Sequence, residues 1–132
     1  MAADETGLSS ACDSILKLDS VVSCTVFDAK GRRLDTKVRA GQSSDFLGKY
    51  GGVIGSVILG GLKSVESFGG KLNTVVATFE SLKIVATVAD SGVAAIVCIP
   101  LFTDAEYIRR MVRSELLRVE VESSWSVQKT SR

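Results

Sequence analysis

The glycines that precede a lysine and a serine in residues 60–64 (GGLKS) suggest phosphate binding. A phosphate-binding loop of the form G-x-x-x-x-G-K-[ST] places the lysine directly after a glycine, between a strand and a helix. In this chain Leu62 separates the glycine from the lysine, and the segment falls inside an expected helix. Residues 51–55 (GGVIG) also lack the G-x-G-x-x-G spacing of dinucleotide-binding proteins. We therefore expect no nucleotide site and no cofactor.

The sequence contains few of the residues and motifs that catalyse reactions in enzymes. The chain has no histidine, which is the commonest general base and metal ligand, and no G-x-S-x-G nucleophile motif. Its acidic residues are scattered among basic ones rather than paired. Cys12, Cys24 and Cys98 are far apart and form no C-x-x-C pair, so we expect small buried thiols in a reducing compartment. We expect no catalytic residues, no metal and no enzymatic activity.

A cluster of arginines is the remaining feature with binding chemistry. Arg109, Arg110 and Arg113 share the outer face of an expected helix, where they could contact phosphate or an acidic partner. A solvated helix face with glutamates nearby explains the same pattern. Only Phe27 and Phe79 are aromatic within the expected strands, and the net charge is +1, so we expect no nucleic acid partner.

Length and composition describe one globular domain. The 132 residues are 45% hydrophobic and 23% charged, enough to bury a core and typical of a soluble protein. The N-terminal MAADETG has no apolar signal region, and the longest uncharged run, residues 50–62, is shorter than the roughly 20 residues that span a bilayer. We expect a cytoplasmic protein without direct membrane insertion.

The segment Phe46–Phe68 is the most unusual in the chain. Its pattern predicts a helix that starts after 43–45 (SSD) and ends at Gly69-Gly70, yet it contains six glycines. Each interior glycine costs a helix about 0.8–1 kcal/mol relative to alanine. A broad apolar arc could rest on a sheet, and a glycine ridge beside it could receive a second backbone. The same glycines could instead let the helix sit tightly on its own sheet or mark a break.

Short apolar runs predict an antiparallel sheet. A hairpin-sized separator follows each of three of these runs, and the last run is apolar on both faces, as in a central strand. The run 33–39 alternates polar and apolar residues, as in an edge strand. The expected strands are Val21–Phe27, Arg33–Arg39, Asn73–Phe79, Lys83–Ala89 and Val93–Ile99, with a turn at Asp28–Gly31.

Two more helices are expected, Asp4–Leu18 and Thr103 to about Val119. Thr103 and Glu106 have the spacing of a capping box that starts the last helix. Glu115 falls in the apolar arc of that helix, where it either pairs with an arginine or marks fraying. We expect residues 1–119 to form the domain and 120–132 a polar, flexible tail. In that tail Trp125 either anchors a partner or is covered by the tail itself.

The resulting order is α-β-β-α-β-β-β-α, an α+β domain with a five-stranded antiparallel sheet flanked by helices. With the turn Asp28–Gly31 between the first two strands and the long helix Phe46–Phe68, residues 4–119 resemble the roadblock (dynein light-chain) family. Longin and profilin-like domains have related sheets, but a longin domain normally begins with a strand rather than with a helix such as Asp4–Leu18.

This resemblance implies a function. Roadblock proteins are non-enzymatic, pair their long helices and third strands in dimers, and serve small Ras-like GTPases as platforms or regulators. The implied chain is a homodimeric scaffold that binds a small GTPase. The implied dimer surface consists of Gly48, Gly51, Gly52, Gly55 and Leu59 with Asn73, Val75, Ala77 and Phe79.

Two alternatives remain open from the sequence. A longin-like or profilin-like monomer could act as an adaptor in vesicle or cytoskeletal traffic, with its sheet edge unpaired. An enzyme or small-molecule sensor could use a pocket between helix and sheet, although no residue constellation supports it.

Overall fold

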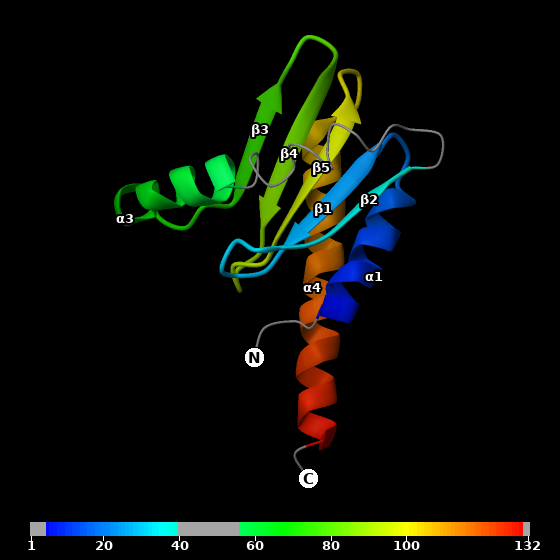
Figure 1. The fold of residues 1–132 in the computed structure, drawn as a ribbon, viewed down its shortest axis with the longest axis vertical. Helices are drawn as coiled ribbons and strands as arrows, with labels where there is room; N and C mark the ends of the chain where they lie inside the picture. Colours follow the sequence, from blue (N-terminus) through cyan, green and yellow to red (C-terminus); the bar gives the residue numbers. More distant parts are fainter. Residues whose placement is uncertain (1–4, 40–55, 131–132) are drawn as a thin grey trace.

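The computed structural model describes residues 5–39 and 56–130, with the side chains of all of these except residues 5, 6, 56, 58, 59 and 121–130. Five strands form one antiparallel sheet in the order β2-β1-β5-β4-β3 (Figure 1). This confirms the predicted fold class, the edge position of the second strand and the central position of the fifth. The strands are β1 (Ser23–Phe27), β2 (Arg33–Val38), β3 (Thr74–Thr78), β4 (Leu82–Val88) and β5 (Ala94–Pro100).

Two helices, α1 (Glu5–Leu16) and α4 (Ala105–Thr130), cover the same face of the sheet (Figure 1). Ile15 of α1, Ile108 of α4 and Val97 of β5 belong to the larger core cluster on that face. The alternate residues of the strands form a second buried cluster on the opposite face, which includes Phe27 and Ile96. The sheet is therefore apolar on both sides, and β5 is buried on both, as its sequence predicts.

The turn between β1 and β2 is built around Asp28. The Asp28 carbonyl accepts a hydrogen bond from the Gly31 N–H, and carboxylate Oδ1 accepts from the N–H groups of Lys30 and Arg32, all at 2.9 Å. Oδ2 accepts from Arg32 Nε at 2.7 Å. Gly31 has φ of +84°, a backbone conformation that is unfavourable for residues with a Cβ atom. The predicted turn is confirmed.

This turn has a testable pH dependence. Burial raises the pKa of Asp28, but the hydrogen bonds from Arg32 and Lys30 outweigh burial and hold the pKa below its ordinary value. Because the pKa of Asp28 is lower in the folded state than in the unfolded state, its ionised form stabilises the fold at pH values above the unfolded-state pKa of about 3.9. This stabilisation is lost as the pH falls through the folded-state pKa. We expect Asp28→Asn to lower the free energy of unfolding by about 1–2 kcal/mol at pH 7. Urea titrations should show that difference shrinking towards pH 3.

The control for this prediction is Asp19→Asn. Asp19 is exposed, and the described residues provide no hydrogen-bond partner for its side chain. Its substitution should therefore change the free energy of unfolding by less than about 0.5 kcal/mol at either pH. An Asp28→Asn deficit that stayed the same at pH 7 and pH 3 would show that the Asp28 charge does not stabilise the turn.

The expected helix Phe46–Phe68 differs from its prediction. Residues 46–55 lie outside the described part of the chain. The remainder is helical but irregular, with a π-helical turn η1 (Ser56–Gly61), a 3₁₀ turn η2 (Leu62–Val65) and a short α3 (Glu66–Gly69). Gly60-Gly61 lies where the first two meet, consistent with the low cost of irregular backbone at glycine. As predicted, Gly70 ends the segment, with φ of +86° and its N–H bonded to the Glu66 carbonyl.

The described apolar residues of this segment are not buried against the sheet, on which the sequence suggested that the apolar arc could rest. Val57 is 63% exposed and Phe68 93% exposed, and no residue of η2 or α3 is buried. In Figure 1 the segment leads away from the start of β3, far from α1 and α4. Sequence periodicity identified the apolar residues correctly but could not show whether the sheet or another molecule covers them.

The last helix also needs correction. Helix α4 starts at Ala105, and Asp104 rather than Thr103 is its cap, since Asp104 Oδ1 accepts from the Glu106 N–H at 3.1 Å. The helix runs to Thr130 instead of ending near Val119, so most of the predicted tail is helical. Residues 105–130 contain no glycine or proline to stop it. Glu115 pairs with Arg118 at 2.9 Å, which settles the open question about its role.

Candidate partner interface

The outer strand β3 ends the sheet with an unpaired edge. Among the residues that the structure describes, β3 pairs only with β4, in the register Thr74↔Thr87 to Thr78↔Lys83. Within the described residues no hydrogen bond joins the other side of β3 to any segment. An unpaired edge presents backbone donors and acceptors to any strand that reaches it.

Two hydrogen bonds at the ends of β3 identify the outward groups. The Val88 N–H donates to the Asn73 carbonyl at 2.9 Å, and the Phe79 N–H donates to the Leu82 carbonyl at 2.8 Å. Hydrogen-bonded pairs alternate along an antiparallel ladder, so Val75 and Ala77 also direct their backbone groups to β4. The residues between them direct theirs outwards. The free edge therefore consists of Thr74, Val76 and Thr78.

Exposed apolar side chains gather beside this edge. Val76 is 47% exposed and Phe79 54% exposed, and the helical segment before β3 adds four more large apolar residues that solvent reaches. Large apolar side chains left open to water beside an unpaired strand edge are typical of interaction sites. The residues are Val57, Leu62, Val65 and Phe68 of the helical segment and Val76 and Phe79 at β3.

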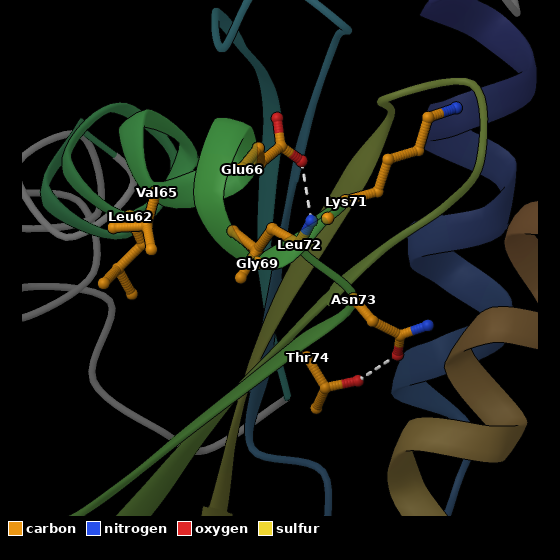
Figure 2. Close-up of a pocket in the computed structure, with 9 residues that line it drawn as sticks. Leu62, Val65, Glu66, Gly69, Lys71, Leu72, Asn73 and Thr74 are labelled. Carbon is orange, nitrogen blue, oxygen red and sulfur yellow. Dashed lines mark hydrogen bonds between the residues drawn. The ribbon is translucent and has the colours of Figure 1, made fainter.

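A hollow of about 360 Å³ lies between the helical segment and the start of β3 (Figure 2). Its shape depends on the link between α3 and β3, where Glu66 Oε2 accepts a hydrogen bond from the Leu72 N–H at 2.6 Å. At its other end Thr74 Oγ1 donates to Asn73 Oδ1 at 2.6 Å. The lining residues are Leu62, Val65, Glu66, Gly69, Gly70, Lys71, Leu72, Asn73 and Thr74.

Comparisons with solved structures show which fold this is. A roadblock/LC7 domain from Streptomyces avermitilis matches with a TM-score of 0.67 at 15% identity, covering 87% of this chain and 96% of that one. The gliding protein MglB from Thermus thermophilus matches with a TM-score of 0.70 at 10% identity, covering 89% and 91%. The chain has a roadblock fold. A further structure, described as MglB with a tetrameric arrangement, matches with a TM-score of 0.66 at 13% identity, covering 89% and 90%.

The similarity to roadblock proteins was detected by comparing structures and not by comparing sequences. No family model and no curated protein sequence matches the chain. At 10–15% identity the neighbours share the order and pairing of elements rather than a motif. The resemblance inferred from element order is therefore confirmed at the level of the fold.

The residues predicted for the dimer surface have different positions in this fold. Gly48, Gly51, Gly52 and Gly55 lie outside the described residues, and the backbone of Leu59 belongs to η1. Val75 and Ala77 pack against the second core cluster. Asn73 and Phe79 are exposed at the two ends of β3.

The sequence analysis missed the outward residues Thr74, Val76 and Thr78. A usable signal was present, because the two-residue separator Glu80-Ser81 makes Phe79 and Leu82 a hydrogen-bonded pair. That pair assigns the backbone direction of every residue in β3.

The predicted glycine ridge lies outside the described residues, but two other glycines of the expected helix, Gly60 and Gly61, are described. A Cβ added to Gly60 or Gly61 would meet no described atom within 4 Å. Packing within the described chain therefore does not explain these two glycines, and the interpretation that they fit the helix tightly to its own sheet loses its support there.

The arginines of α4 have partners within the chain. Arg109 binds Glu106 through Nε at 2.9 Å, and Arg113 Nη2 lies 3.1 Å from Asp90 Oδ1. Arg110 reaches Glu106 only at 4.0 Å and is largely exposed. These ion pairs within the chain agree with the interpretation of the arginine cluster as a solvated helix face.

Two further searches cover the described residues. Among them, no group of three His, Cys, Asp or Glu side chains is placed to hold a metal ion. No helix in that part of the chain is long and apolar enough to cross a bilayer. Cys12, Cys24 and Cys98 are free and buried, and the Cys12 thiol donates to the Cys24 carbonyl at 3.2 Å.

Proposed function

We propose that this protein is a non-enzymatic scaffold that forms a homodimer in the cytoplasm and binds a small Ras-like GTPase. The observation that carries the proposal is the unpaired edge of β3 beside six exposed apolar side chains. A surface of this kind fits a protein partner better than a small substrate, because the adjoining hollow is open and lacks clustered titratable groups.

The dimer forms when β3 of one copy pairs antiparallel with β3 of another. This arrangement gives the outward groups of Thr74, Val76 and Thr78 backbone partners and continues one sheet through both copies. It also brings each helical segment to the interface, where its apolar side chains lose contact with water. The neighbour described as MglB with a tetrameric arrangement supports self-association in this fold.

The proposed GTPase partner rests on the roadblock resemblance, since roadblock dimers serve small GTPases as platforms or regulators. Two MglB structures, one of them of a gliding protein, share this fold. The chain contributes surface and orientation to such a complex, while nucleotide is held by the GTPase. The absence of histidine and of a phosphate-binding motif from the sequence is consistent with this division.

A pull-down from native lysate tests the GTPase partner. The tagged chain should enrich a Ras-like GTPase, identified by mass spectrometry, with different recovery in the presence of GDP and of a non-hydrolysable GTP analogue. A matched bait carrying Val76→Pro shows whether binding needs the dimer. Recovery of no GTPase in either nucleotide state would contradict the proposed partner and leave the dimer to be judged separately.

A further inference from the structure

We propose that the hollow beside β3 is completed by the second copy of the chain, whose Phe79 side chain fills it. This inference rests on the dimer of the proposed function and specifies its register. It assigns Phe79 a binding site that the described residues of its own chain leave open, because the hollow and Phe79 lie at opposite ends of the same strand.

The outward backbone groups determine the register. In an antiparallel pair of identical strands, hydrogen-bonded positions must face one another, so outward residues face outward residues. Only the register centred on Val76 places all three outward residues of one copy opposite outward residues of the other. Val76 then faces Val76 of the second copy, and Thr74 faces Thr78 of the second copy. Shifts of the centre to Val75 or Ala77 leave one outward residue of each strand without such a partner.

This register determines the position of Phe79. If Thr78 of the second copy faces Thr74, the next residue, Phe79 of the second copy, faces Asn73. Asn73 lines the hollow. Directly opposed residues of an antiparallel pair point to the same face of the sheet. Residues 73, 75, 77 and 79 share the face of the second core cluster, against which Leu72 of the hollow also packs. The Phe79 ring of the second copy therefore lies on the same face of the sheet as the hollow.

The ring of Phe79 and the walls of the hollow are both apolar. Phe79 is 54% exposed in the single chain, so its ring retains apolar area to bury. Leu62, Val65 and Leu72 give the hollow apolar walls. Glu66 Oε2 already accepts a hydrogen bond from the Leu72 N–H, so a ring entering the hollow does not leave that oxygen without a hydrogen-bond partner.

The size of the interface gives a further argument. A strand of five residues is too short to bury, alone, the roughly 1,200 Å² or more of total surface that stable interfaces require. Contacts outside the ladder must therefore contribute. The two-fold symmetry of the pair places Phe79 in the hollow twice, once at each end of the joined strands.

Cysteine cross-linking tests the register directly. In this register Asn73 and Phe79 of the second copy form a non-hydrogen-bonded pair, with Cβ atoms about 4.5–5.5 Å apart. The double variant Asn73→Cys/Phe79→Cys should form a disulfide-linked dimer with oxidised glutathione, seen as doubled mass without reductant. The single variants Asn73→Cys and Phe79→Cys are matched controls. Each should stay unlinked, since identical positions lie about 20 Å apart along the joined strands.

The affinity of the dimer tests the role of the ring. Phe79→Ala should raise the dimer dissociation constant about ten- to hundredfold in sedimentation equilibrium, because two rings are lost per dimer. The control is Phe102→Ala, which removes an 84% exposed ring from the loop between β5 and α4 and should change the constant less than about twofold. Circular dichroism should show that both variants are folded.

The outcomes separate this inference from the proposed function. A wild-type chain that stays monomeric would overturn the dimer and the inference together. A wild-type dimer that is unaffected by Phe79→Ala, or that cross-links through a single variant instead of the double variant, would overturn the register while the dimer stands.

Discussion

Replacing Val76 with proline is expected to raise the dissociation constant of the dimer at least about a hundredfold while leaving each chain folded. The Val76 N–H points away from β4, so its loss removes no hydrogen bond within the chain. Proline is tolerated in an edge strand when its missing N–H faces solvent. At the centre of the dimer, however, the substitution removes a donor from both copies and puts a ring where the second strand must lie. A hundredfold change corresponds to about 2.8 kcal/mol.

Val75→Pro is the matched control for this prediction. Val75 lies opposite Ala86, and its N–H belongs to the ladder with β4. Proline there should therefore lower the free energy of unfolding, whereas Val76→Pro should change it little once the dimer has been separated by dilution. Sedimentation and urea unfolding of both variants measure the two effects. A Val76→Pro chain that still dimerised with wild-type affinity would place the interface elsewhere.

Phe27→Ala is expected to cause the largest loss of stability in the chain, about 3–5 kcal/mol in free energy of unfolding. Phe27 is 1% exposed and belongs to the second core cluster. Its cross-strand neighbour on β5 is Ala94, which pairs in turn with Val88 of β4. Small and branched neighbours cannot refill the volume of a lost ring without backbone movement, so a cavity remains.

Phe68→Ala provides the comparison. Phe68 is 93% exposed, and its truncation should change monomer stability by less than about 0.5 kcal/mol. Urea titration of the wild type and both variants at low micromolar concentration measures these differences. Equal destabilisation by the two substitutions would show that the second cluster is not a structural core.

The sheet could be predicted from the sequence because each strand carries its own signal. The run 93–99 has no polar alternation and becomes the central β5, while the alternating run 33–39 becomes the edge strand β2. Hairpin-sized separators then fix which strands are neighbours. These signals are local, so a single sequence contains them in full.

The helix boundaries were predicted less well than the strands, because adjacent residues can compete for the same structural role. Thr103 and Asp104 are both good caps, and Asp104 makes the bond. Helix α4 continues to Thr130, because residues 120–130 can form a helix although they are mostly polar. From the sequence, their polar composition was interpreted as a flexible tail. For the segment before β3, periodicity shows an apolar face but not its partner.

The interface could be predicted only in outline. Resemblance in element order indicated β3 and the preceding helix, and the exposed Val76, Phe79 and Phe68 agree with that region. Of the residues predicted in this strand, Val75 and Ala77 direct their backbone groups to β4, while Asn73 and Phe79 are exposed at its two ends. Element order alone does not show the direction of the backbone groups. The hollow was not predictable, since it depends on the path of the chain between α3 and β3.

Sedimentation equilibrium of the wild-type chain, from low to high micromolar concentration, tests the central claim most directly. The account predicts a species of twice the mass of one chain, in reversible equilibrium with the monomer. A single-chain mass throughout that range would contradict the dimer and with it the proposed scaffold.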